Sequence, residues 1–174
     1  MLPNLDNKLP DVLMFLYNVM VASEPLLVLA AEKSNGALQE YFKDHLEEER
    51  SHDQWLKEDL LGYDIETIPE DHIAAAMAGS QYYWINHGHP EYLLGYMYFL
   101  EGSPMPMDQV EHLEEIYGKG LLRTLRYHAT HDPDHVKDIR AMIALQPNKD
   151  AILYNAKQTA EYYAYAMKRI ALCQ

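Results

Sequence analysis

Apolar residues recur along most of the chain at intervals of three and four, which is the spacing of amphipathic helices. In residues 37–62, for example, Leu38, Phe42 and Leu46 follow one another at intervals of four and would share one helical face. No window alternates apolar and polar residues as a half-buried strand would, and no linker or repeat divides the chain. The pattern predicts one all-α domain, residues 1–174, of about seven or eight helices.

Proline, glycine and asparagine residues mark where these helices should end. The segments predicted to be helical are 11–34 in two pieces, 37–62, 69–78, 81–101 in two pieces, 107–117, 121–130, 134–145 and 149–172. Ser23 is expected to cap the second piece of the first segment, and breaks are expected at Gly79–Ser80 and near residues 88–90. The segment 37–62 is expected to be one continuous helix. Asp132 and Pro133 are expected to interrupt a helix, with Asp132 as the cap of its second half.

The composition narrows the class of partner. A net charge of −13 argues against nucleic acid and anionic membrane as partners, because both require clusters of Lys and Arg. Polar residues and Pro25 interrupt the most apolar stretch, 12–31, so we interpret it as a core helix and expect no membrane span. The N-terminus lacks the basic region of a signal peptide, and the single cysteine, Cys173, excludes an internal disulfide. We therefore expect a cytoplasmic protein.

One stretch, 126–135, carries candidate metal ligands. His128, Asp132 and His135 are spaced by four and three residues, so on a helix they would form one stripe. Two imidazoles and a carboxylate suit half of an iron or manganese site. The simpler interpretation is that Asp132 is only a helix cap and that the two histidines lie at the surface.

A second group lies in the segment 37–62. His45, Glu48, Glu49 and His52 fall within about 100° of one another on a helix. Glu49 and His52 have the Glu-x-x-His spacing of carboxylate-bridged dinuclear sites in helical bundles. The alternative is a solvated acidic face, since residues 47–50 are all charged.

Glu101 stands apart because it ends the apolar run 92–100. A buried carboxylate is costly unless it is paired or bound to a metal, although Glu101 could also be the exposed last residue before the turn at Gly102. His87 and His89 form a further pair. His89 is a candidate to contact either the metal-ligating side chains or the substrate. The simpler interpretation is a structural or surface histidine.

Together these segments supply three histidines and three carboxylates, with Glu48 or Glu49 as one of the acids. Two cations held by mixed nitrogen and oxygen ligands, with positions left open for oxygen, need about this set. The absence of a mid-chain cysteine argues against a Cys-rich structural zinc site.

The phrases 48–55 and 94–102, followed by His128-x-x-x-Asp132-x-x-His135, resemble the haem-oxygenase-like diiron oxidases, often labelled iron-containing redox enzymes. These share an all-α fold with haem oxygenase, thiaminase II and pyrroloquinoline-quinone synthase. The resemblance implies two Fe ions, or an Fe/Mn pair, which activate O2 to oxidise a small amino-acid-like or fatty-acid-like substrate with an external electron donor. The ligands that it implies are Glu48, His52, Glu101, His128, Asp132 and His135.

The chain departs from that family in one ligand. Some members place a glutamate seven residues before the first histidine, and His45 occupies that position here. Glu49 and His45 therefore remain open as alternatives to Glu48, and a homodimer remains open as the oligomeric state. A haem-binding or haem-degrading enzyme of the same fold is the second hypothesis, and a non-enzymatic helical binding protein is the third.

Overall fold

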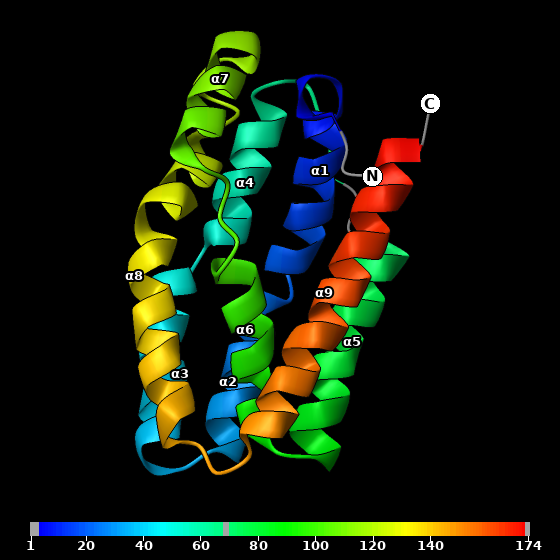
Figure 1. Ribbon diagram of the computed structural model, residues 1–174. Helices are drawn as coiled ribbons and strands as arrows, with labels where there is room; N and C mark the ends of the chain where they lie inside the picture. The colour runs from blue at the N-terminus through cyan, green and yellow to red at the C-terminus, as the bar shows by residue number, and fades with distance from the viewer. Residues whose placement is uncertain (1–3, 68–69, 173–174) are drawn as a thin grey trace.

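The computed structural model describes residues 4–67 and 70–172, and within these residues it is a bundle of helices with no strand (Figure 1). The elements in chain order are α1 (Leu5–Met20), α2 (Ser23–Lys33), α3 (Gly36–Glu49), α4 (His52–Leu61), α5 (His72–His87), the 3₁₀ helix η1 (Pro90–Tyr92), α6 (Leu93–Glu101), α7 (Met107–Tyr117), α8 (Arg123–Leu145) and α9 (Lys149–Leu172). If α1 with α2 and α3 with α4 are each counted as one interrupted helix, the described residues form seven α-helical units. The predicted all-α bundle of about seven or eight helices is confirmed. Cys173 and Pro69 lie outside the described residues.

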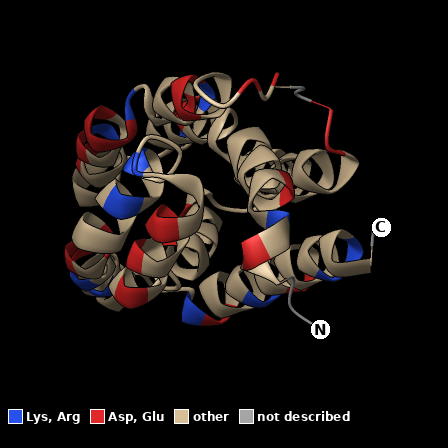
Figure 2. Cartoon of the chain, turned by 90° about the horizontal axis from the view of Figure 1, so that it is seen from above, with Lys and Arg blue, Asp and Glu red and all other residues tan. Residues whose placement is uncertain are grey.

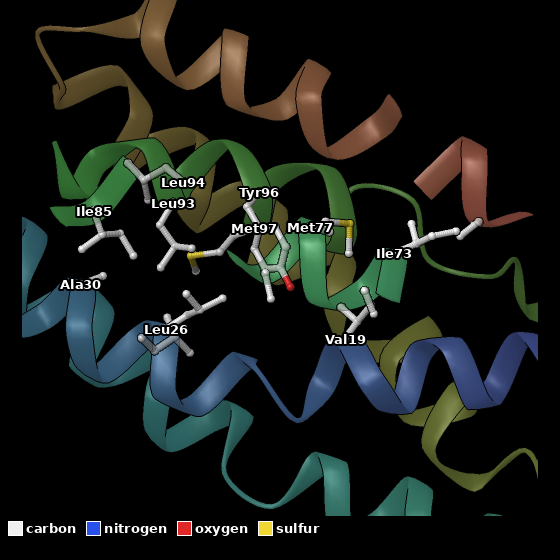
Figure 3. Close-up of a cluster of buried hydrophobic side chains, with 14 of the residues drawn as sticks. Val19, Leu26, Ala30, Ile73, Met77, Ile85, Leu93, Leu94, Tyr96 and Met97 are labelled. Atoms are coloured by element: carbon white, nitrogen blue, oxygen red, sulfur yellow. The ribbon is translucent and has the colours of Figure 1, made fainter. Parts of the chain in front are cut away.

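The buried apolar side chains form two clusters that meet at α1. Leu9 and Leu13 of α1 pack with residues of α4, α7 and α8, such as Leu60 and Leu113. Residues of α1 on another face pack with α2, α5, α6 and α9 (Figure 3). α1 therefore contributes side chains to both clusters.

Gly95 lets α6 approach α9 very closely. A Cβ at this position would lie 2.2 Å from the carbonyl oxygen of Ile152 and 2.8 Å from the backbone nitrogen of Ala156. No side chain fits there without moving backbone. The contact therefore sets the position of α6, which carries Tyr96 and ends at Glu101.

Two predictions about helix breaks are wrong in opposite directions. The segment 37–62 is not continuous, because α3 ends at Glu49 and Ser51 takes the left-handed conformation (φ 67°) before α4 begins at His52. Conversely, α8 runs without interruption through Pro133. Asp132 is therefore an interior residue of α8 and not a cap. In an α-helix Pro133 removes one backbone hydrogen bond, and the packing of α8 against its neighbours outweighs that local cost.

Other boundaries follow the predictions more closely. The predicted break at residues 88–90 is confirmed, since α5 ends at His87 and η1 begins at Pro90. The predicted break at Gly79–Ser80 is wrong, because α5 continues through it from its cap at Asp71. The prediction that Ser23 caps a helix is also wrong, since Ser23 is the first residue of α2 and Ala22 is the cap.

Two surface properties bear on partners. Seen from above in Figure 2, acidic segments outnumber basic ones, in keeping with the net charge of −13. Among the described residues, Leu5–Lys33 is the stretch whose length and apolar composition would suit a membrane span. Core helices of soluble proteins meet the same criterion, and Leu13, Phe15 and Leu26 of this stretch are fully buried in the bundle.

Candidate metal centre

Histidine and carboxylate side chains from four helices meet in the interior of the bundle. The structure brings together every candidate ligand named from the sequence, including both alternatives. They are His45, Glu48 and Glu49 of α3, His52 of α4, Glu101 of α6, and His128, Asp132 and His135 of α8. His45, His52, Glu101 and Asp132 are buried, with exposures of 8% or less.

One group of ligand atoms gathers around His45 and His135. A set of donor atoms from His45, Glu48 and His135 lies within 4.8 Å of one another. Glu101 joins the two imidazoles, since its Oε1 lies 3.1 Å from His45 Nε2 and its Oε2 lies 3.4 Å from His135 Nδ1. Glu48 closes the outer side, with its Oε2 3.5 Å from His45 Nδ1 and a side chain that is 53% exposed.

A second group gathers around His52 and His128. Donor atoms of Glu49, His52 and His128 also lie within 4.8 Å of one another. Glu49 Oε2 is 3.3 Å from His52 Nδ1, and the Glu49 side chain is only 10% exposed. Asp132 Oδ1 is 2.9 Å from His128 Nδ1 and 4.0 Å from His135 Nδ1, so Asp132 lies between the two groups.

The break between α3 and α4 falls within the second group, between Glu49 and His52. Glu49 is the last residue of α3 and His52 is the first residue of α4, so the step at residues 50–51 sets their relative orientation. That step is held from α2, because the backbone N–H of Ser51 donates a hydrogen bond of 2.7 Å to Glu24 Oε1. Sequence reasoning missed Glu24, which lies 27 residues away and has no local signal.

Several buried ligand atoms are left without a protein partner. Six atoms of the cluster have no hydrogen-bond partner among the described residues: Glu49 Oε1, His52 Nδ1, His52 Nε2, Glu101 Oε2, His128 Nε2 and His135 Nδ1. The ring nitrogens that lie 3.3–3.4 Å from a carboxylate oxygen lack the alignment of a hydrogen bond. Each buried unsatisfied polar atom costs about 1–3 kcal/mol, so such a concentration calls for a missing partner. A metal ion satisfies both nitrogen and carboxylate donors, and the donor set therefore fits a metal centre.

The charges in the cluster are strongly coupled. Burial by itself would raise the pKa of Glu49, but the imidazoles of His52 and His128 outweigh it and lower the pKa to about 2. The carboxylate of Glu101 raises the pKa of His135 to about 9, against the opposing effect of burial. Burial would lower the pKa of His45, and the hydrogen bond to Glu101 reverses the direction and raises it. In the metal-free protein a cation must therefore displace the proton of His135.

A cavity of about 400 Å³ adjoins the cluster. Its walls come from α1, α2, α6, α9, parts of α3, α7 and α8, and the segment that joins α6 to α7. His45, Glu49, Glu101, His128 and Asp132 form part of the lining. A small molecule in this cavity would therefore lie against the candidate ligands.

The structure does not bring the remaining predicted histidines to the cluster. His89 is exposed, precedes η1 and is not among the described residues that line the cavity. His87 is exposed beside Tyr83 on the outside of α5. His131 is exposed, with its ring stacked on Tyr127 at 4.1 Å between centroids.

Two tyrosines close to the cluster were also missed, of which Tyr96 is buried and Tyr41 is partly buried. Tyr41 stacks on His45 with ring centroids 6.0 Å apart, and Tyr96 lines the cavity. Tyr41 could have been found, because it precedes His45 by four residues and so shares its helical face. Tyr96 precedes Glu101 by five residues, and its relation to the cavity depends on the packing of α6.

Comparisons with family models, with curated proteins and with solved structures found no match to this chain. The class that the fold and the site define is accordingly a helical bundle with a buried histidine–carboxylate cluster beside an apolar cavity.

Proposed function

We propose that this protein is a non-haem dinuclear iron oxidase or oxygenase, with an Fe/Mn pair as the alternative metal content. The observation that carries the proposal is the set of six buried, unpartnered ligand atoms, which four helices bring together in two adjacent groups. Histidine nitrogen with carboxylate oxygen is the donor set typical of non-haem iron and manganese. The resemblance of the sequence to haem-oxygenase-like diiron oxidases favours the same assignment.

Each group would hold one ion. Glu49, His52 and His128 would bind the first, with Asp132 beside them. The second would be bound by His45, Glu101 and His135, with Glu48 within reach at the surface side. Two iron ions, when bound, supply the capacity to activate O2 for the oxidation of an organic substrate.

The protein's own residues prepare this site. The Asp132 carboxylate contacts His128 Nδ1. This contact leaves Nε2 as the ring nitrogen that is free to bind a metal ion. Glu49 is ionised at neutral pH and needs no proton removed before it binds a cation. The apolar walls of the cavity restrict water around the reacting atoms.

Metal analysis tests the proposal directly. Protein reconstituted anaerobically with Fe(II) should retain about two irons per chain, one for each ligand group. Retention of no iron would overturn the proposal. A Soret band that appears on addition of haem and is lost on substitution of a single histidine would instead favour the haem-binding alternative.

Matched substitutions separate the ligands from a neighbouring histidine. Glu101→Ala and His128→Ala should lower iron content and abolish O2-dependent turnover with little change in helicity by circular dichroism. His131→Ala is the control, because His131 is exposed on the same helix. If His131→Ala lost as much iron as His128→Ala, the assignment of ligands on α8 would be wrong.

A further inference from the structure

The cavity beside the cluster is long and mostly apolar. It is lined by Leu5 and Met20, at opposite ends of α1, and continues to Leu27 of α2. At 1.5 Å per residue, Leu5 and Met20 are about 22 Å apart along the helix. The candidate ligands line one part of this length, so most of the cavity surface is aliphatic or aromatic. Such a shape suits an extended apolar chain.

Once the histidines are bound to metal, the lining offers no counter-charge for an anion. Among the described residues that line the cavity, none is a lysine or an arginine, whereas Glu49, Glu101 and Asp132 all contribute. With Glu48, the cluster holds four carboxylates, which would balance the four positive charges of two divalent ions. The loaded centre would therefore have no surplus positive charge for a substrate carboxylate. A zwitterionic amino acid would also leave one of its charges unpaired against apolar walls, which is costly.

Tyr96 supplies one polar contact inside the cavity. It extends from α6 toward the junction of α1 and α2, between Leu26 and Val19 (Figure 3). Its side chain is buried, and its hydroxyl has no hydrogen-bond partner in the described part of the chain. Burial raises the pKa of Tyr96, with Glu49 as a further cause, so the hydroxyl keeps its proton and can donate it to an acceptor.

We propose that the cavity binds an alkyl-chain compound with one uncharged hydrogen-bond-accepting group, such as an alcohol, an aldehyde or an amide. The chain lies along α1, and the acceptor group accepts a hydrogen bond from the Tyr96 hydroxyl, close to Glu49. To call this molecule the substrate rests on the proposed function. Its binding does not, because the apolar walls and Tyr96 belong to the metal-free protein.

Binding is measured by calorimetry on metal-free and on iron-reconstituted protein. The ligands are hexanol, octanol and decanol, with decanoate, decylamine, leucine and tyrosine for comparison. Each added methylene should tighten binding about fourfold, since burial of one CH₂ contributes about 0.8 kcal/mol. With iron-reconstituted protein, decanoate should bind at least tenfold more weakly than decanol, and the amino acids should not bind. Decanoate binding as tight as decanol, or affinity that is independent of chain length, would overturn the inference.

Three variants test the placement. Tyr96→Phe should weaken decanol binding about tenfold by removing one buried hydrogen bond. Leu16→Trp, which fills the cavity from α1, should abolish binding, whereas Leu153→Trp at an exposed position outside the lining should leave it unchanged. Equal affinities of Tyr96→Phe and the parent protein would refute the role of Tyr96.

The two proposals fail in different ways. Iron content is measured in the same samples. Chain-length-dependent alcohol binding by protein that retains no iron after reconstitution would overturn the proposed oxidase and support the apolar ligand site. Two irons per chain without chain-length-dependent binding would support the proposed oxidase and overturn the apolar ligand site.

Discussion

The hydrogen bond between Glu24 and Ser51 predicts a link between α2 and the candidate metal centre. Ser51 lies in the left-handed region between Glu49 and His52, and Glu24 Oε1 accepts a hydrogen bond of 2.7 Å from its backbone N–H. We expect Glu24→Ala to loosen this step, because nothing local favours a left-handed serine there. The substitution should lower the free energy of unfolding and disturb the geometry of the Glu49–His52 pair.

The magnitude follows from the contact. A hydrogen bond to a charged group contributes about 1.5–3 kcal/mol net, and water can partly replace it because Glu24 is only half-buried. Glu24→Ala should thus lower the free energy of unfolding by about 1–2 kcal/mol, or roughly 2–8 °C in Tm for a chain of this length. Glu24→Gln keeps an acceptor and should lose about half as much. Ser51→Gly should stabilise by up to about 1 kcal/mol, because glycine adopts the left-handed conformation without strain.

The assay is urea unfolding of the metal-free protein, followed by titration with Fe(II). Glu24→Ala should weaken binding at the group of Glu49 and His52, so that one of the two irons is lost first. Glu47→Ala is the control, because Glu47 pairs with Arg50 at the exposed surface of the same step and should cost no more than about 0.5 kcal/mol. If Glu24→Ala proved no more destabilising than Glu47→Ala, or if both irons weakened equally, the reasoning would be refuted.

Other predictions concern the helices that carry the site. Gly95→Ala should destabilise by more than about 2 kcal/mol in urea unfolding, whereas Gly79→Ala, whose added Cβ meets no described atom within 4 Å, should stabilise by about 0.5–1 kcal/mol. Equal effects would contradict the close α6–α9 contact. Pro133→Ala should stabilise α8 by about 1–3 kcal/mol, seen as a higher Tm, because it restores a backbone hydrogen bond within a continuous helix. The pKa of His135 is raised from 6.5 to about 9, so its contribution to stability is complete below about pH 6.5 and is lost as the pH rises through 9. Urea unfolding of metal-free protein should show that loss, and His135→Gln should flatten it; the same slope in the variant would exclude His135 as its source.

Local pattern was enough for the fold class and for most of the candidate ligands that the structure brings together. Three- and four-residue spacing depends only on the helical period, so it identified the all-α bundle and the helices α7 and α9. The same period placed His128, Asp132 and His135 on one stripe, and α8 carries them together. Glu101 was found because a carboxylate at the end of an apolar run must have a partner if it is buried, and its partners are imidazoles.

Local pattern did not predict where all the helices break, because long-range contacts compete there with local preference. Pro133 is a local break signal, yet α8 packs as one helix and tolerates it. Residues 50–51 carry no glycine or proline, yet the chain breaks there, where a side chain 27 residues away holds the backbone. That break places Glu49 with His52 and leaves Glu48 with His45, a division that one continuous helix did not indicate.

By itself, then, the sequence determined which residue types share a helical face, since that depends on neighbours within one or two turns. The tertiary structure decided which faces meet, which carboxylate lies beside which histidine, and where the cavity lies. Those outcomes depend on contacts between helices far apart in the chain, such as Gly95 against Ile152 and Glu24 against Ser51. No local period encodes them.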